Sequence, residues 1–103
     1  WASLVRLMGA RGAAGRDEPG RAEGAALQLE ARRHHDAWDR LGDVVSPTFV
    51  CGGRYDAIAP PENSERLASA IPDARLALFE GGHLFLLQDR GAWPAIAAFL
   101  SAR

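Results

Sequence analysis

Two short apolar runs separated by one helix-length segment constrain the fold of this chain more than any other feature. The runs, residues 44–51 and 75–79, are rich in residues that favour β-strands, and each is followed by a pair of glycines that lets the chain turn. Between them, Pro60 and Pro61 suit the beginning of a helix and Pro72 stops it. Two strands joined by a crossover helix of this length must be parallel neighbours, with a right-handed crossover.

Helical periodicity flanks this unit on both sides. From about Ala25, residues recur at intervals of three and four on one stripe, and Gly42 ends the pattern as a glycine after a helix does. A last helix is predicted from about Asp89. The predicted order is therefore helix, strand, helix, strand, helix, with these helical stripes: Leu27, Ala31, His34, Trp38 and Leu41 in the first helix, and Trp93, Ile96, Ala97 and Leu100 in the last.

The first 24 residues differ in composition from the rest. Residues 9–24 are crowded with glycine and charged side chains, and this composition disfavours both helix and strand. We therefore divide the chain into residues 1–24, a mobile connection, and residues 25–103, the folded part.

Two parallel strands do not complete a sheet. A parallel sheet is stable when several strands are sandwiched between layers of helices, and two strands leave an open apolar edge. The sequence therefore predicts an α/β fold, a three-layer α/β/α sandwich, whose other strands come from residues outside this chain. Self-association through the open edge is the alternative.

The overall composition excludes several classes of protein. A net charge of -1, from 12 basic and 13 acidic residues, provides no basic face for nucleic acid. No run of apolar residues is long enough to span a membrane. The single cysteine, Cys51, cannot form an internal disulfide, which is compatible with a cytoplasmic location. Apart from the histidines, every basic residue is arginine, and alanine is abundant. Both features are typical of proteins from GC-rich bacterial genomes.

A carboxylate and an imidazole follow the two predicted strands. Asp56 comes shortly after the first strand and its glycine pair, and His83 comes directly after the second pair, Gly81 and Gly82. In open parallel sheets, groups that act on ligands lie just past the carboxyl ends of the strands, so these two side chains should lie side by side. The carboxylate can then hold the Nδ1–H of the imidazole, which lets Nε2 accept a proton from a nucleophile.

Several short motifs resemble, in order, the C-terminal third of α/β-hydrolases, in particular 3-oxoadipate enol-lactonase-like members. They are a strand of the form Pro-Thr-x-x-Val, an acid turn of the form Gly-x-x-Asp with a proline after it, a helix exit of the form Ile-Pro-x-Ala, and a Gly-His turn. The resemblance runs from about Leu27 to the end of the chain and rests on these segments: residues 34–41, 46–61, 71–75 and 81–83.

The resemblance implies a Ser-His-Asp hydrolase of small carboxylic esters or lactones that needs no cofactor or metal, with Asp56 and His83 as catalytic residues. Residues 1–24 would then be the end of a lid region. In that family the nucleophile stands on a Gly-x-Ser-x-Gly turn upstream of the acid. No serine here has those flanking glycines, so this chain supplies the acid and the base but not the nucleophile; the serines are Ser3, Ser46, Ser64, Ser69 and Ser101.

Other interpretations stay open beside this one. The chain could be a truncated, non-catalytic remnant or interaction module, or part of an epoxide or haloalkane hydrolase with an upstream aspartate nucleophile. Asp56 alone could simply close its loop by binding backbone N–H groups. His34 and His35 are adjacent and cannot form a metal pair, with His34 predicted to face the core and His35 the solvent. Gly52 and Gly53 lack the spacing of a dinucleotide site. Tyr55, beside the acid turn, is equally compatible with the border of a pocket and with structural support, and structural roles are favoured for the remaining candidates: Cys51, Trp38, Trp93, Phe85 and Leu86.

Overall fold

The structure is a computed structural model that describes residues 1–102, and it divides into two compact units. The first unit is Trp1–Asp36, and the second begins at Ala37. The predicted division of the chain at residues 24 and 25 therefore falls inside the first unit. Each unit is described by itself.

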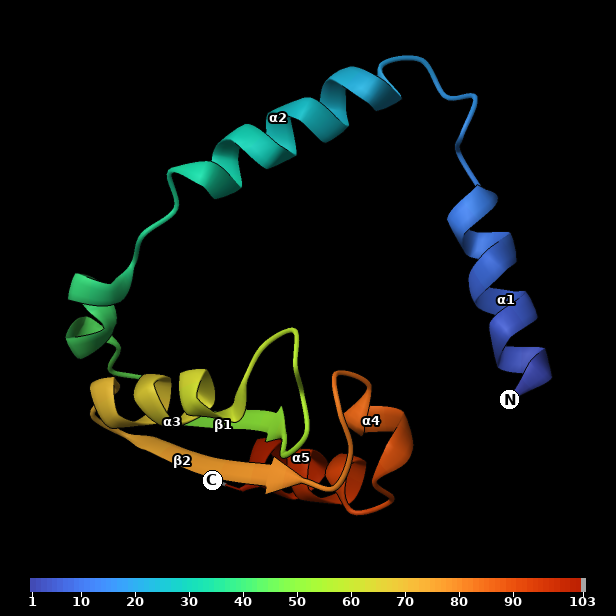
Figure 1. Cartoon of the computed structure of the whole chain (residues 1–103). Helices are drawn as coiled ribbons and strands as arrows, with labels where there is room; N and C mark the ends of the chain where they lie inside the picture. The colour runs from blue at the N-terminus through green and yellow to red at the C-terminus, as the bar shows by residue number, and fades with distance from the viewer. Residues whose placement is uncertain (103) are drawn as a thin grey trace. The chain divides into compact units, whose positions relative to one another are not determined.

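The first unit contains two helices, α1 (Ala2–Ala13) and α2 (Arg21–Arg33) (Figure 1). The prediction that residues 9–24 form neither helix nor strand is wrong at both ends of that segment. Gly9 and Gly12 lie within α1, where each glycine costs roughly 1 kcal/mol relative to alanine, but alanine, leucine, methionine and arginine around them favour helix. Only the connection between the helices is irregular, and Gly15 and Gly20 there have φ angles of 76° and 78°.

The single helix predicted from Ala25 to Leu41 is interrupted. α2 ends at Arg33, and a separate 3-10 helix, η1 (Trp38–Asp43), follows in the second unit. Leu27 is 64% exposed, so no buried stripe holds one continuous helix together. His34, predicted to face the core, is exposed and pairs with Glu30 one turn earlier at 2.9 Å.

The second unit is built on the predicted strand–helix–strand arrangement. Strands β1 (Thr48–Gly53) and β2 (Ala74–Phe79) pair in parallel, and α3 (Pro61–Ala70) connects them. The register places Val50 opposite Leu76 and Gly53 opposite Phe79. The first strand begins later than predicted because Pro47 has no N–H to donate to a ladder, and it continues through the glycine pair that was expected to turn.

Helices α3 and α5 (Ala92–Ser101) lie on opposite faces of this sheet (Figure 1). The ring of Phe49 contacts Phe99 of α5, with ring centroids 5.2 Å apart. Gly52 faces α3, since a Cβ added there would meet Ser64 at 2.8 Å. Side chains three positions apart on a strand point to opposite faces, so one helix covers each side.

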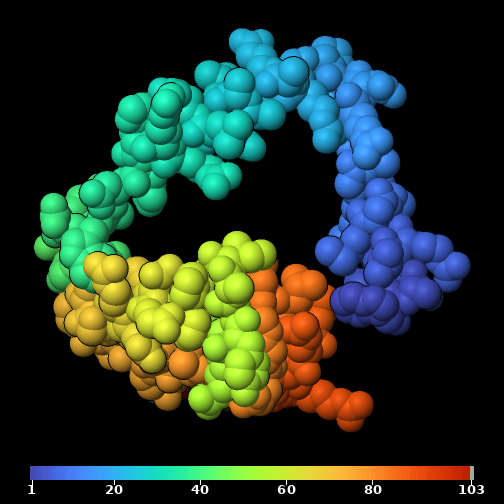
Figure 2. Space-filling view, viewed as in Figure 1, coloured from blue at the N-terminus to red at the C-terminus, as the bar shows by residue number. Residues whose placement is uncertain are grey.

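The strands are only partly covered, although the sequence predicts burial on both faces. Ile71 and Ala92 are the buried hydrophobic residues among those described, and Leu76 of β2 is 39% exposed. Trp93, predicted to pack, is 58% exposed. Figure 2 shows the residues from α3 through β2 and the segment after it as one continuous packed body. Two strands between helices are consistent with part of an α/β fold, and the larger three-layer sandwich stays a prediction.

Candidate active site

The loop after β1 carries Asp56 and lies directly against the loop after β2. A Cβ added at Gly53 would overlap the carbonyl oxygens of Gly81 and Gly82, so only glycine allows this approach. Beyond the strands, the N–H of Arg54 donates to Phe79 and that of Tyr55 donates to Gly81, both at 3.0 Å. The two loops therefore stay hydrogen-bonded up to the residue before Asp56.

Asp56 is the buried polar residue of this site, at 7% exposure. Its Oδ1 accepts the backbone N–H groups of Ile58 and Ala59, each at 2.9 Å, and its Oδ2 lies 3.0 Å from Nδ1 of His83. The Ala59 N–H is the main cause that lowers the pKa of Asp56 from its ordinary 3.8, with help from His83 and Ile58, while burial acts in the opposite direction. Asp56 is therefore a carboxylate near neutral pH.

The partner of Asp56, His83, has a half-exposed side chain at 53%. A carboxylate can only accept a hydrogen bond, so Nδ1 of His83 carries the proton in this pair. Nε2 is then the basic nitrogen of the ring and is available to take a proton from another group. The predicted contact between the two side chains is present.

Asp56 also closes its own loop, as the competing interpretation of this residue expects. One carboxylate oxygen binds the loop backbone and the other binds the imidazole, so the structural and functional interpretations do not exclude each other. Because hydrogen bonds to the loop already fix the Asp56 side chain, this side chain has no rotamer freedom to lose when a reaction begins. It can therefore hold the imidazole of His83 in one orientation.

The loop after β2 is held by residues that the sequence analysis did not identify. Oε1 of Gln88 accepts the N–H of Gly82, and the carboxylate of Asp89 accepts the N–H groups of Glu80 and Gly91, all at 2.8 Å. The Gly91 N–H, followed by that of Glu80, lowers the pKa of Asp89 from its ordinary value. Gln88 is the last residue of a one-turn helix, α4 (Phe85–Gln88), that was also not predicted, and Asp89 follows it. The signal in the sequence for these hydrogen bonds was the position of two polar residues, Gln88 and Asp89, shortly after the Gly-Gly-His turn.

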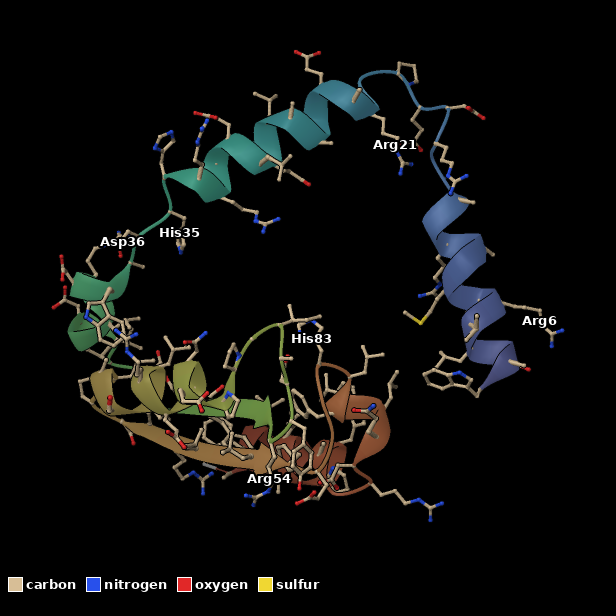
Figure 3. All side chains as sticks on the ribbon, viewed as in Figure 1. Arg6, Arg21, His35, Asp36, Arg54 and His83 are labelled. Carbon is tan, nitrogen blue, oxygen red and sulfur yellow. The ribbon has the colours of Figure 1, made fainter. Side chains whose placement is uncertain are left out.

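An ion pair joins the outer sides of the two loops. Nε of Arg54 lies 3.0 Å from Oε1 of Glu80, and their side chains are 52% and 66% exposed. Figure 3 labels Arg54 and His83, which come from the two loops past the ends of the strands. An exposed pair of this kind contributes about 0–1 kcal/mol to stability. The ion pair between Arg54 and Glu80 therefore adds only a little to the stability of the contact between the two loops.

The other candidate residues have ordinary surroundings. Burial raises the pKa of Cys51, which disfavours a reactive thiolate. Tyr55 is 71% exposed, and the Phe85 ring stacks on Phe79 with centroids 5.6 Å apart. The guanidinium of Arg66 lies 4.9 Å from the centre of the Trp38 ring, a packing contact. Within residues 1–102, no group of three or more histidine, cysteine or acidic side chains could hold a metal ion.

A surface depression of about 560 Å³ lies at the opposite end of the strands. Its lining comes from the beginnings of β1 and β2, from the residues just before them, and from the end of α5 with the residue that follows: Pro47, Thr48, Asp73, Arg75, Phe99, Leu100 and Ala102. Asp56 and His83 follow the strands, so this hollow does not belong to the same site.

The geometry defines an acid–base pair that can activate a nucleophile, and comparisons with known proteins point to hydrolases. No protein-family profile matches the chain. A segment of 63 residues is 35% identical to the carbamate hydrolase RutD of Pseudomonas savastanoi pv. phaseolicola, and covers 60% of this chain and 24% of that protein. A segment of 61 residues is 38% identical to a poly(3-hydroxyalkanoate) depolymerase of Ectopseudomonas oleovorans, and covers 58% of this chain and 22% of that protein.

A third relative is a much larger protein. Over 74 residues the chain is 40% identical to polyketide synthase ThaQ of Burkholderia thailandensis, a match that covers 70% of this chain and 4% of the synthase. The chain thus spans a quarter or less of the length of these three relatives. The names of two of these relatives, a carbamate hydrolase and a depolymerase, support a similarity to hydrolases in general, and none of the three names an enol-lactonase. No helix among residues 1–102 is long and apolar enough to cross a membrane.

Proposed function

We propose that this chain supplies the acid and the base of an α/β-hydrolase, and that the nucleophile is a serine outside these 103 residues. The observation that carries the proposal is the 3.0 Å contact between Nδ1 of His83 and the buried carboxylate of Asp56, at the carboxyl ends of two parallel strands. The similarity to proteins named as hydrolases supports it. The complete sheet would be the predicted three-layer sandwich.

The proposed reaction is hydrolysis of a small carboxylic ester or lactone. Nε2 of His83 takes the proton of the serine hydroxyl while the oxygen attacks the carbonyl carbon, and it then gives that proton to the departing alcohol oxygen. Water then attacks the acyl-enzyme and loses its proton to His83, which gives that proton to the departing serine oxygen, so that the carboxylic acid is released and the serine is free again. Asp56 holds Nδ1–H throughout and stabilises the imidazolium, and no cofactor or metal takes part.

The substrate class is the finer part of this proposal. The motif resemblance makes enol-lactones the first candidate substrates. The names of two relatives add a carbamate and a hydroxyalkanoate ester as candidates. All three present a carbonyl carbon to the same attack. A cytoplasmic location is part of the proposal and rests on the single, unpaired Cys51.

A fluorophosphonate probe tests the proposal on the product of the complete open reading frame. The probe should label the protein, and His83→Ala should abolish labelling, whereas His35→Ala should leave it unchanged because His35 is exposed in the other unit. Unchanged labelling of His83→Ala would exclude the proposed role of His83. If the probe does not label the protein, but the protein hydrolyses epoxides or haloalkanes and His83→Ala abolishes that activity, then the nucleophile is an aspartate rather than a serine. An unlabelled protein without any such activity would be a non-catalytic remnant.

We also propose that the 103-residue chain self-associates through the open edges of its sheet. The two strands pair only with each other among the described residues, and partly exposed apolar side chains such as Leu76 line the sheet. Unpaired edges of this kind favour pairing with another chain. Light scattering on the isolated chain should detect oligomers, and a monodisperse monomer at high concentration would contradict this proposal.

A further inference from the structure

The imidazole of His83 is poorly confined by its own contacts. Its side chain is half exposed, and the hydrogen bond recorded for it is the one with Asp56. A half-exposed ring has few walls to fix its position, so the geometry of that bond depends on where the backbone holds residue 83. The backbone immediately before His83 therefore decides whether the acid and the base stay in contact.

That backbone is held from both sides. On the β1 side, Gly53 leaves no room between itself and the carbonyl groups of Gly81 and Gly82. On the other side, Oε1 of Gln88 accepts the N–H of Gly82 at 2.8 Å, and the N–H of Phe85 donates to the carbonyl of Gly82 at 3.1 Å. The peptide groups before the imidazole are thus fixed between a strand and α4.

Gln88 also shapes the turn that carries His83. Gly81 has a φ of 135°, a conformation that L side chains rarely adopt, and a Cβ there would lie 2.5 Å from Oε1 of Gln88. The glutamine side chain therefore fills the space that the missing Cβ leaves, and it packs directly on the turn. Removal of its amide would free the Gly82 N–H and open that space at once.

The frame that carries Gln88 does not depend on Asp56. The next residue, Asp89, bridges the end of β2 and the start of α5 through the N–H groups of Glu80 and Gly91. The stacking of Phe85 on Phe79 anchors the start of α4 to β2. Gln88 therefore reaches the turn from a separately anchored segment.

We propose that Gln88 is a positioning residue for His83: its amide oxygen holds the Gly82 peptide so that Nδ1 of the imidazole stays within hydrogen-bonding distance of Asp56. Gln88 touches no reacting atom in this assignment and acts through the backbone. The spectroscopic consequence stands on the geometry alone, whereas the kinetic consequence rests on the proposed hydrolase function.

The test uses the product of the complete open reading frame with ¹⁵N-labelled histidine. In Gln88→Leu, the Nδ1–H proton of His83 should exchange with water about tenfold faster or more, and kcat should fall by roughly tenfold to a hundredfold with KM nearly unchanged. Gln88→Glu keeps an acceptor oxygen and should retain the slow exchange. Leu87→Ala, an exposed neighbour on the same turn, is the matched control.

The two proposals fail in distinguishable ways. If Gln88→Leu lowers the melting temperature but leaves the Nδ1–H exchange unchanged, Gln88 is merely structural and the positioning role is overturned. If the exchange changes as expected but the protein hydrolyses nothing, the positioning role stands and only the hydrolase function fails. Should Gln88→Leu not fold, Gln88→Asn carries the same test, because its shorter side chain withdraws the amide from Gly82.

Discussion

The loop after β1 and the loop after β2 hold the two halves of the candidate site by different means. In the acid loop, residues 54–60, the Asp56 carboxylate accepts N–H groups two and three positions further along, so the loop is closed by its own functional residue. In the base loop, residues 80–84, the backbone is held by Gln88 and Asp89, side chains from the segment that follows. Asp56 is thus held within its own loop, whereas the turn that carries His83 is held by side chains of another segment.

This difference separates the effects that substitutions should have. A change to Asp56 alters the orientation of the imidazole and the closure of the acid loop together. A change to Gln88 alters the base loop, and a change to Asp89 alters the base loop and the start of α5. Gly53 is the last residue of β1, directly before the acid loop, and it touches the base loop at Gly81 and Gly82. Substitutions at these places measure how far the two loops act as one site.

The largest expected effect follows from Asp56→Asn. An asparagine can still accept the N–H groups of Ile58 and Ala59 through Oδ1, but its Nδ2 is a donor and cannot accept the Nδ1–H of His83. The imidazole then favours the wrong tautomer, and kcat of the complete protein should fall by about 10³–10⁴. Steady-state kinetics measure this. Asp73→Asn, at the opposite end of the strands, is the control, and an equal loss there would contradict a specific role for Asp56.

Gly53→Ala should cause the next largest effect, on stability. The new Cβ would overlap the carbonyl oxygens of Gly81 and Gly82, so the loops must separate, at a cost of about 3 kcal/mol in the free energy of unfolding. Gly42→Ala is the matched control, since a Cβ there meets nothing within 4 Å. Urea unfolding gives both values. Equal midpoints for the two variants would show that the loops do not need their close contact.

A smaller effect concerns pH and compares the two carboxylates directly. Both Asp56 and Asp89 have a pKa below the ordinary 3.8, so each stabilises the folded state fully above that value and loses its contribution as the pH falls through the lowered pKa. Stability should therefore drop below about pH 4. Asp56→Asn and Asp89→Asn should each flatten part of this drop in thermal unfolding. A curve unchanged in both variants would contradict the proposed hydrogen bonds.

Sequence reasoning succeeded where short-range rules decide the structure. The parallel pairing of β1 and β2, the helix between Pro61 and Ala70, and the contact of Asp56 with His83 all follow from apolar runs, prolines and the position of polar residues after strands. These features depend on the local chain and on the fixed geometry of a strand–helix–strand unit. They could be predicted without knowing what packs against them.

Sequence reasoning failed where several choices satisfy the same pattern. The periodicity from Ala25 to Leu41 fits one helix as well as two, and composition at Gly9 and Gly12 did not reveal a helix. The roles of Gln88 and Asp89 were missed because their partners are backbone N–H groups, and every residue other than proline offers one. Such bonds leave no residue-type signature in the partner.

The smallest expected effect concerns the ion pair between Arg54 and Glu80. Both side chains are more than half exposed, so Arg54→Ala should lower the free energy of unfolding by about 1 kcal/mol or less and should matter less at high salt. The loops are already joined by the backbone bonds of Arg54 and Tyr55, which the substitution keeps. Urea unfolding at low and high salt, with Arg90→Ala as the control, measures the difference. A loss as large as that of Gly53→Ala would mean that the charge pair, rather than the glycine contact, holds the acid and base loops together.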